Sequence, residues 1–271
     1  MSLDQLQGHF GFSRLPFGRE IAADRLYRSR AHREALARIS FLISQGAIGV
    51  VTAEVGAGKT TALRAATSAL DRSRHTIVYL PNPAVGERGI YQALIHALGG
   101  RLRFHKAELI CQATELLERE SGERGKQVTV AIDEAHLLSP QQLEELRMLT
   151  NAEMDSRSPF SLILLGQPQL RRYLRFGSFA ALDQRIALRY ELSGMDLEES
   201  ASYVRHHLEL AGRKDGLFSD DAIALIHQAS RGLPRQINNL AIQALIASLI
   251  EGKAIVDQRC VQAAVTEVTA E

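Results

Sequence analysis

The feature that most constrains this chain is a glycine-containing loop between an apolar run and a helical pattern. The run Ile48–Thr52 is short and rich in β-branched residues, as buried strands are, and a helix is predicted from the end of the loop to Leu70. The loop between them has the sequence AEVGAGKTT. A strand, a loop of small residues and a helix that opens with Lys-Thr together predict a P-loop.

The residue types of this loop suit the binding of a nucleoside triphosphate. Small residues let backbone N–H groups wrap the phosphates, and the helix that follows adds the positive end of its dipole. Lys59 would bring a charge to the β and γ phosphates, and Thr60 a hydroxyl to magnesium. Ala53 replaces the first glycine of the motif, at a position that only starts the turn. We predict that ATP and Mg²⁺ are bound here by Val55, Gly56, Ala57, Gly58, Lys59, Thr60 and Thr61.

A second apolar run ends in two acids. Val128–Ile132 precedes Asp133 and Glu134, which is a Walker B pattern. Asp133 would hold magnesium together with Thr60, and Glu134 would orient or deprotonate the attacking water. The alternative is a surface turn after a buried strand. A P-loop about 75 residues earlier favours the catalytic interpretation. Two adjacent acids at a metal suit hydrolysis better than transfer to a second small substrate.

The order of elements predicts the fold class. Strands near 48–52, 76–80, 128–132, 160–165 and 187–192 alternate with helices, which predicts parallel pairing in an α/β sandwich. After residue 195 the pattern becomes helical, near 197–211, 220–230, 234–250 and 257–268. Ser219 is a predicted N-cap, and Pro234 lies in a first turn. We therefore expect an N-terminal arm and first helix (1–46) packed on the nucleotide-binding domain, the α/β domain itself (47–194) and a small all-helical domain (195–271).

Composition excludes some classes of protein. The formal net charge is +1, with 45% hydrophobic and 23% charged residues, as in soluble globular proteins. Nothing global favours nucleic acid or membranes, so any basic surface must be local. Cys111 and Cys260 lie far apart in the sequence, which favours two reduced thiols. The start of the sequence lacks an apolar signal core, and Leu240–Ile250 is too short to span a membrane. We expect a cytoplasmic protein with no membrane partner.

These residues resemble those of the AAA+ ATPases, whose fold is a five-stranded parallel sheet in an α/β/α sandwich followed by a helical lid. The resemblance implies that Gln167 is sensor 1, that Arg235 in GLPRQINNL is sensor 2, and that Asn82 restrains the Walker B glutamate. It also implies that Arg185 is an arginine finger that completes a neighbouring subunit's site, with Arg189 as the alternative finger. Each residue also has a structural interpretation: Arg235 could cap carbonyls, the other two arginines could pair with surface acids, and Asn82 could belong to a turn.

A closer resemblance, to the ExeA, TniB and TnsC group, covers nearly the whole chain. It rests on FGFSRLPFG, SRAHREALARI, EVGAGKTT, IDEAHLLS, GQPQLRR, LDQRIALRYEL and SRGLPRQINNLA. The soluble members of that group imply a slow ATP hydrolase that assembles on double-stranded DNA, as a ring or a filament, and recruits or regulates a transposase. DNA or oligomerisation would stimulate hydrolysis. Two alternatives stay open: a secretion-type motor that acts on proteins, and an ATP-binding assembly switch with little turnover.

Local basic residues supply candidate DNA contacts. Arg101, Arg103 and Lys106 follow the helix after the second strand, where the resembling group has elements that face the bore of the ring or filament. Arg171, Arg172 and Arg175 form a second basic segment, and the arginine-rich arm before residue 31 is a third. Solvated helix ends are the alternative for the first two segments. No sequence-specific DNA-binding motif is visible, so any contact should tolerate many sequences.

Overall fold

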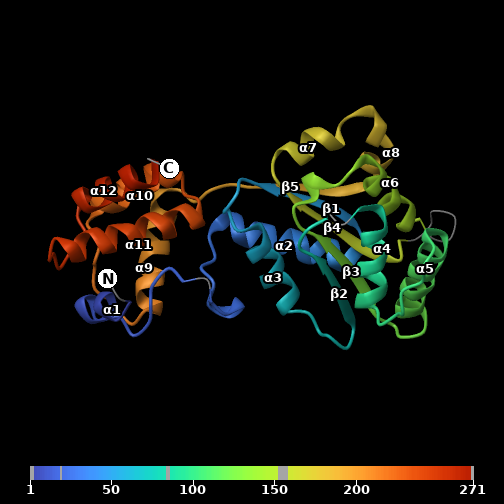
Figure 1. The fold of residues 1–271 in the computed structure, drawn as a ribbon, viewed down its shortest axis with the longest axis horizontal. Helices are drawn as coiled ribbons and strands as arrows, with labels where there is room; N and C mark the ends of the chain where they lie inside the picture. The colour runs from blue at the N-terminus through green and yellow to red at the C-terminus, as the bar shows by residue number, and fades with distance from the viewer. Residues whose placement is uncertain (1–2, 19, 84–85, 152–157, 270–271) are drawn as a thin grey trace. The chain divides into compact units, whose positions relative to one another are not determined.

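The computed structural model of the chain describes residues 3–18, 20–83, 86–151 and 158–269 and divides into two compact units (Figure 1). The first unit contains the N-terminal residues through Ala31, the short stretch Gly56–Gly58 and the chain from Ser193 onward. The second unit contains His32–Val55 and Lys59–Leu192. Each unit has its own apolar core.

The second unit is built on one five-stranded parallel sheet. Its strands are β1 (Ile48–Ala53), β2 (His75–Leu80), β3 (Gln127–Ile132), β4 (Phe160–Gly166) and β5 (Ile186–Leu192), in the spatial order β2-β3-β4-β1-β5. β1 and β4 are buried along their whole length. The fold class predicted from the alternation of strands and helices is confirmed, because parallel strands require crossover connections such as these helices.

Helices flank this sheet. They are α2 (Arg30–Gln45), α3 (Lys59–Ser68), α4 (Gly86–Ala97), α5 (Lys106–Gly122), α6 (Pro140–Leu149), α7 (Gln169–Leu174) and α8 (Ala180–Arg185). In β3, Val128, Val130 and Ile132 belong to the core cluster that also contains apolar residues of α4, α5 and α6. Since side chains alternate along a strand, Thr129, Ala131 and the following Asp133 point to the opposite face. That alternation places the acidic end of β3 on the face away from those helices.

The first unit is helical. It contains α1 (Leu3–Phe10), α9 (Leu197–Leu210), α10 (Asp220–Ser230), α11 (Pro234–Ile250) and α12 (Gln258–Thr269). The side chain of Ser219 accepts a hydrogen bond from the backbone N–H of Ala222, and Pro234 occupies the first turn of α11, so both predicted start signals are confirmed. The helical C-terminal region follows β5, as the sequence pattern predicted.

The N-terminal arm differs from its expected placement. Leu6, Phe10, Phe12 and Phe17 are buried in the core of the helical unit and not in that of the α/β unit. Phe17 stacks on His207 of α9 with ring centroids 5.2 Å apart. Burial lowers the pKa of His207 to about 3, so the imidazole is a neutral packing partner at physiological pH. The expectation that residues 1–46 pack together on the nucleotide-binding domain is therefore corrected: the arm up to Ala31 belongs to the helical unit.

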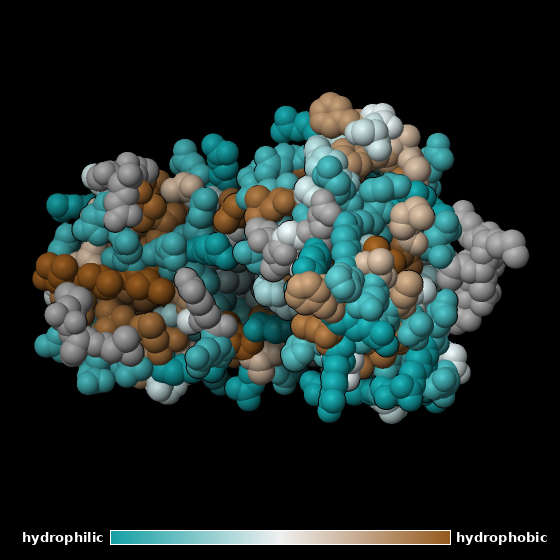
Figure 2. Space-filling model, turned by 45° about the vertical axis from the view of Figure 1, so that its right-hand side comes forward, coloured by the Kyte–Doolittle hydropathy of each residue, from teal (hydrophilic) through white to brown (hydrophobic). Residues whose placement is uncertain are grey.

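Apolar side chains also reach the surface of the helical unit. Ile250 and Ile255 are 70% and 53% exposed, and Figure 2 shows hydrophobic residues gathered on one face of this unit. Among the described residues, no helix combines the length and the apolar character needed to cross a bilayer.

Gly232 is expected to be indispensable to the helical unit. Its φ is +71°, and a Cβ added there would lie 1.9 Å from the carbonyl oxygen of Met195. Gly252 has a similar φ of +65° but open space around its Cβ position. Gly252→Ala should cost about 1 kcal/mol of backbone strain. Gly232→Ala should cost a further 1–3 kcal/mol or so, from the steric clash. Urea unfolding followed by circular dichroism would measure both, and equal losses would contradict the proposed clash.

Candidate functional site

The P-loop joins β1 to α3 as the sequence predicted. Gly56 and Gly58 have φ values of +85° and +100°, a region that residues with a Cβ avoid. This conformation explains why glycine occupies these positions, and such turns point successive backbone N–H groups toward an anion. α3 begins at Lys59, so the positive end of its dipole is at the loop. The loop is therefore suited to hold phosphates.

Lys59 is folded back on the start of the loop. Its ammonium group is buried and donates hydrogen bonds to the carbonyl oxygens of Ala53, at 2.9 Å, and Glu54, at 3.3 Å. Ala53 is the last residue of β1, where the backbone is extended, and it contributes only its carbonyl group. The strand conformation thus gives a physical reason why alanine can replace the first glycine of the motif.

The carboxylate and the hydroxyl that are expected to hold magnesium are in contact. The hydroxyl of Thr60 donates to Oδ2 of Asp133 at 2.6 Å, across 73 residues of sequence. Asp133 is only 5% exposed, and the backbone N–H of Glu134 donates to its Oδ1 at 2.9 Å. A hydroxyl and a carboxylate are hard oxygen ligands of the kind that Mg²⁺ takes alongside phosphate oxygens. The pair therefore fits Mg²⁺ bound to a nucleotide.

Tyr79, which no sequence motif singled out, also reaches this carboxylate. Its hydroxyl donates to Oδ2 of Asp133 at 3.0 Å. Tyr79 pairs with Ala131 in the β2–β3 register, so it shares a face of the sheet with Asp133. Burial raises the pKa of Tyr79 to about 12, and the charges of Asp133 and Glu134 add to the shift. The phenol therefore keeps its proton at neutral pH. Strand alternation combined with the register of β2 against β3 is the signal that could have found it.

Glu134 has a backbone conformation that is rare for a residue with a side chain. Its φ and ψ are 50° and 35°, in the left-handed region, and such strained residues cluster at functional sites. Oε2 of Glu134 lies 3.4 Å from Nδ1 of the buried His136. The backbone N–H of Gln167, just beyond β4, is 3.5 Å from the same nitrogen. His136 therefore lies within reach of both the Walker B glutamate and the segment of the predicted sensor 1, although its Nδ1 atom can bond to only one of them at a time.

Comparison with known proteins agrees with this geometry. Residues 42–174 match the family described as AAA domain. The chain carries an AAA+ ATPase domain. It is 35% identical over 247 residues to the general secretion pathway protein A of Aeromonas hydrophila, a match that covers 90% of this chain and 45% of that protein. The chain thus spans less than half the length of this curated relative.

Solved structures of AAA+ proteins have the same fold. Cdc6p from Pyrobaculum aerophilum superposes with a TM-score of 0.69 at 15% identity, covering 89% of this chain and 67% of that one. A chain of the Drosophila ORC bound to DNA superposes with a TM-score of 0.69 at 18% identity, and the match covers 98% of this chain and 66% of the ORC chain. At such identities the likeness concerns the fold alone.

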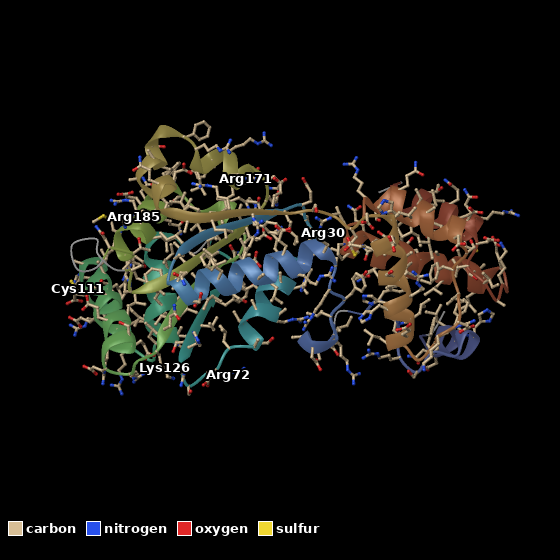
Figure 3. The ribbon with its side chains drawn as sticks, turned by 180° about the vertical axis from the view of Figure 1, so that it is seen from behind. Arg30, Arg72, Cys111, Lys126, Arg171 and Arg185 are labelled. Carbon is tan, nitrogen blue, oxygen red and sulfur yellow. The ribbon has the colours of Figure 1, made fainter. Side chains whose placement is uncertain are left out.

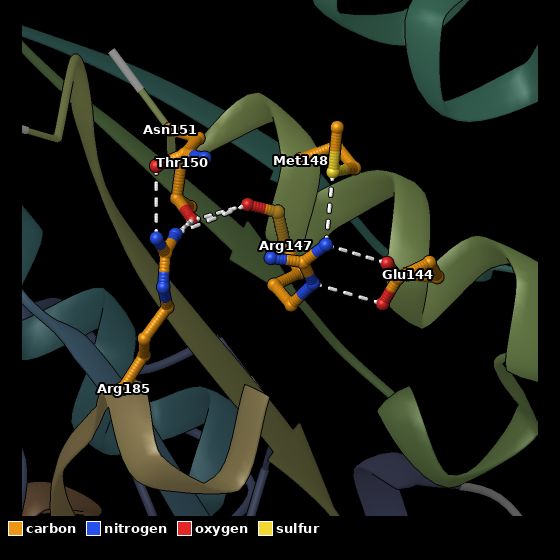
Figure 4. Close-up of polar contacts among 6 residues, drawn as sticks. All are labelled: Glu144, Arg147, Met148, Thr150, Asn151 and Arg185. Carbon is orange, nitrogen blue, oxygen red and sulfur yellow. Dashed lines mark hydrogen bonds and ion pairs between the residues drawn. The ribbon is translucent and has the colours of Figure 1, made fainter. Parts of the chain in front are cut away.

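In this AAA+ domain, Arg185 is held by the end of α6 (Figures 3 and 4). Its guanidinium donates to Oδ1 of Asn151 at 2.8 Å, to the hydroxyl of Thr150 at 3.2 Å and to the carbonyl oxygen of Arg147 at 3.4 Å. The oxygen atoms of these three residues hold the guanidinium in place. Arg189, the alternative finger, forms an ion pair with Asp183 at 2.7 Å, which fits the surface-acid interpretation for that residue.

Two further residues were predicted to belong to the site. Arg235 follows Pro234 in the first turn of α11, in the helical unit. Asn82 is exposed and lies two residues beyond the end of β2. Their roles as sensor 2 and as the switch for Glu134 stay predictions.

The predicted DNA-contacting residues lie between α4 and the first residue of α5. Arg101 and Arg103 are exposed, whereas Lys106 begins α5 and pairs with Glu145 at 2.6 Å. Sequence reasoning passed over Phe104, which is 78% exposed although it is large and apolar. Neighbouring helices fix this loop: Arg88 of α4 donates to the carbonyl of Phe104, and Gln112 of α5 donates to that of Arg101 at 2.7 Å. The loop therefore presents arginine and phenylalanine side chains on a supported backbone.

Proposed function

We propose that this protein hydrolyses ATP in a magnesium-dependent manner and that its ATP-bound form self-associates. The observation that carries the proposal is the 2.6 Å hydrogen bond between Thr60 and Asp133, which joins the P-loop to the Walker B strand. A phosphate-binding loop and a buried carboxylate in contact are the two halves of a nucleotide-hydrolysing site.

Each residue of the site has a defined task. Lys59 exchanges its bonds to the loop carbonyls for bonds to the β and γ phosphates, where its charge stabilises the transition state. Thr60 and Asp133 would hold Mg²⁺, which would neutralise charge on the phosphates. Glu134 orients the attacking water and accepts its proton, and Gln167 contacts the γ phosphate as sensor 1.

Self-association would allow a second subunit to complete the site. The guanidinium of Arg185 is held by Thr150 and Asn151 at the end of α6, and an arginine supplied in trans can stabilise charge on the transferring phosphoryl group. Arg235 would contact the nucleotide as sensor 2, and Asn82 would restrain Glu134. In this scheme ATP holds subunits together and hydrolysis releases them.

The cellular role that we favour is an ATPase of a protein secretion pathway, because the curated relative at 35% identity is a general secretion pathway protein. In that role, the partners of this chain would be proteins. A second candidate is assembly on double-stranded DNA to recruit or regulate a transposase. The loop with exposed Arg101, Arg103 and Phe104 favours that role, since arginines bind phosphates and aromatic side chains can enter between base steps.

Phosphate release and light scattering test both the proposed biochemical activity and the proposed cellular role. With ATP and Mg²⁺ the chain should release phosphate and gain mass, and Lys59→Ala should lose both properties. A chain that binds no nucleotide would refute the proposed activity.

If the DNA role is correct, a DNA duplex should raise both the rate of ATP hydrolysis and the mass of the assembly. The double substitution Arg103→Ala with Phe104→Ala should remove that effect. Turnover that ignores DNA would favour the secretion role.

A further inference from the structure

The carboxylate of Asp133 receives hydrogen bonds from three segments of the chain. The backbone N–H of Glu134 donates to Oδ1 at 2.9 Å. Oδ2 accepts two hydroxyl groups, that of Thr60 from α3 at 2.6 Å and that of Tyr79 from β2 at 3.0 Å. The two hydroxyl donors therefore converge on a single oxygen atom.

This arrangement uses the acceptor capacity of Oδ2 fully. A carboxylate oxygen offers about two lone-pair sites, and Thr60 and Tyr79 together occupy both. The Thr60 bond is compatible with a bound cation, because a hydroxyl can donate its proton to Asp133 while its own oxygen faces the metal. The Tyr79 bond is different, since it occupies the acceptor site that a cation or a water of its coordination shell needs.

The position of Tyr79 allows it to leave. β2 is an edge strand of the sheet, next to β3 alone, and Tyr79 is 43% exposed. The neighbouring Val78 and Leu80 are buried in the core on the opposite face and anchor the strand. The phenol ring can therefore turn toward solvent about its side-chain bonds without disturbing the core.

We propose that Tyr79 is a positioning residue that responds to magnesium. Its hydroxyl holds Asp133 when the site contains no nucleotide and gives up that bond when Mg²⁺ enters with ATP. Tyr79 thereby raises the magnesium concentration that the site requires, and its ring changes environment as the site fills. The inference deepens the proposed function and rests on it.

The first test is a magnesium titration of nucleotide binding, with a fluorescent ATP analogue. Tyr79→Phe removes the hydroxyl and keeps the ring. The magnesium concentration for half-maximal binding should fall by about three- to tenfold, the range expected for losing one competing hydrogen bond. Tyr173→Phe, on α7, is the matched control and should leave that concentration unchanged.

The second test is spectroscopic and does not depend on turnover. The chain has six tyrosines and no tryptophan, so tyrosine fluorescence is not masked. Addition of Mg²⁺ to the ATP-bound wild-type protein should change this fluorescence. The change should be absent from Tyr79→Phe and retained in Tyr173→Phe.

These measurements separate the inference from the proposed function. If Tyr79→Phe needs the same or more magnesium than the wild type, or retains the fluorescence change, the role of Tyr79 is refuted while nucleotide binding stands. If the wild-type protein binds no ATP analogue with or without Mg²⁺, the proposed function is refuted and the role of Tyr79 with it.

Discussion

Replacing Glu134 with glutamine is expected to lower steady-state ATP hydrolysis by about 100-fold or more while Mg-ATP stays bound. The amide has the size of the carboxylate and keeps the backbone N–H that donates to Asp133, so the magnesium ligands stay in place. It cannot accept a proton from water, which is the task we assign to Glu134. Phosphate release and equilibrium binding of labelled ATP would measure the two effects separately.

The oligomer should respond to the same substitution. If hydrolysis releases subunits, Glu134→Gln should prolong the lifetime of the ATP-bound assembly in light scattering. Glu144→Gln is the matched control, because Glu144 lies on α6 and pairs with Arg147 at the surface. Unchanged phosphate release and assembly lifetime in Glu134→Gln would show that this glutamate is not the base and that hydrolysis does not time disassembly.

The parts of the site that the sequence predicted are those encoded locally. The P-loop needs small residues and a lysine within one turn, and the Walker B acids directly follow an apolar strand, so a short window contains the whole signal. Ser219 and Pro234 likewise mark helix starts through contacts with their own next few residues. Even the substitution of Ala53 for glycine has a local explanation, because that residue ends β1 in extended conformation.

The parts that the sequence did not predict depend on contacts between distant segments. Tyr79 lies 54 residues from Asp133, and only the β2–β3 register brings their side chains together. The aromatics of the arm indicate that it is buried, but the sequence does not say against which surface, and Phe17 packs on His207 of the helical unit. Arg185 differs in the same way, because its contacts with a carbonyl, a hydroxyl and an amide oxygen at the end of α6 join segments 34 to 38 residues apart in the sequence.

The substitution Arg185→Ala is expected to lower ATP hydrolysis by about 1000-fold when assayed alone, the loss typical of a missing arginine finger. The deficient subunit keeps its own Lys59 and Glu134 and lacks only the group that it gives to a neighbour. Mixing Arg185→Ala with Glu134→Gln should therefore restore activity. In the mixed assembly, the second variant supplies Arg185 to a site whose Glu134 is intact.

A change in the structure around Arg185 must be distinguished from the loss of its action on a neighbouring subunit. Thr150→Val with Asn151→Ala removes two partners of Arg185 but keeps its guanidinium, so it should reduce hydrolysis far less than Arg185→Ala does. Arg189→Ala tests the alternative finger, which is bound to Asp183. Recovery in a mixture of Arg189→Ala and Glu134→Gln, without recovery for Arg185→Ala, would assign the finger to Arg189. A mixture of Arg185→Ala and Glu134→Gln that stays inactive would mean that Arg185 acts within its own subunit.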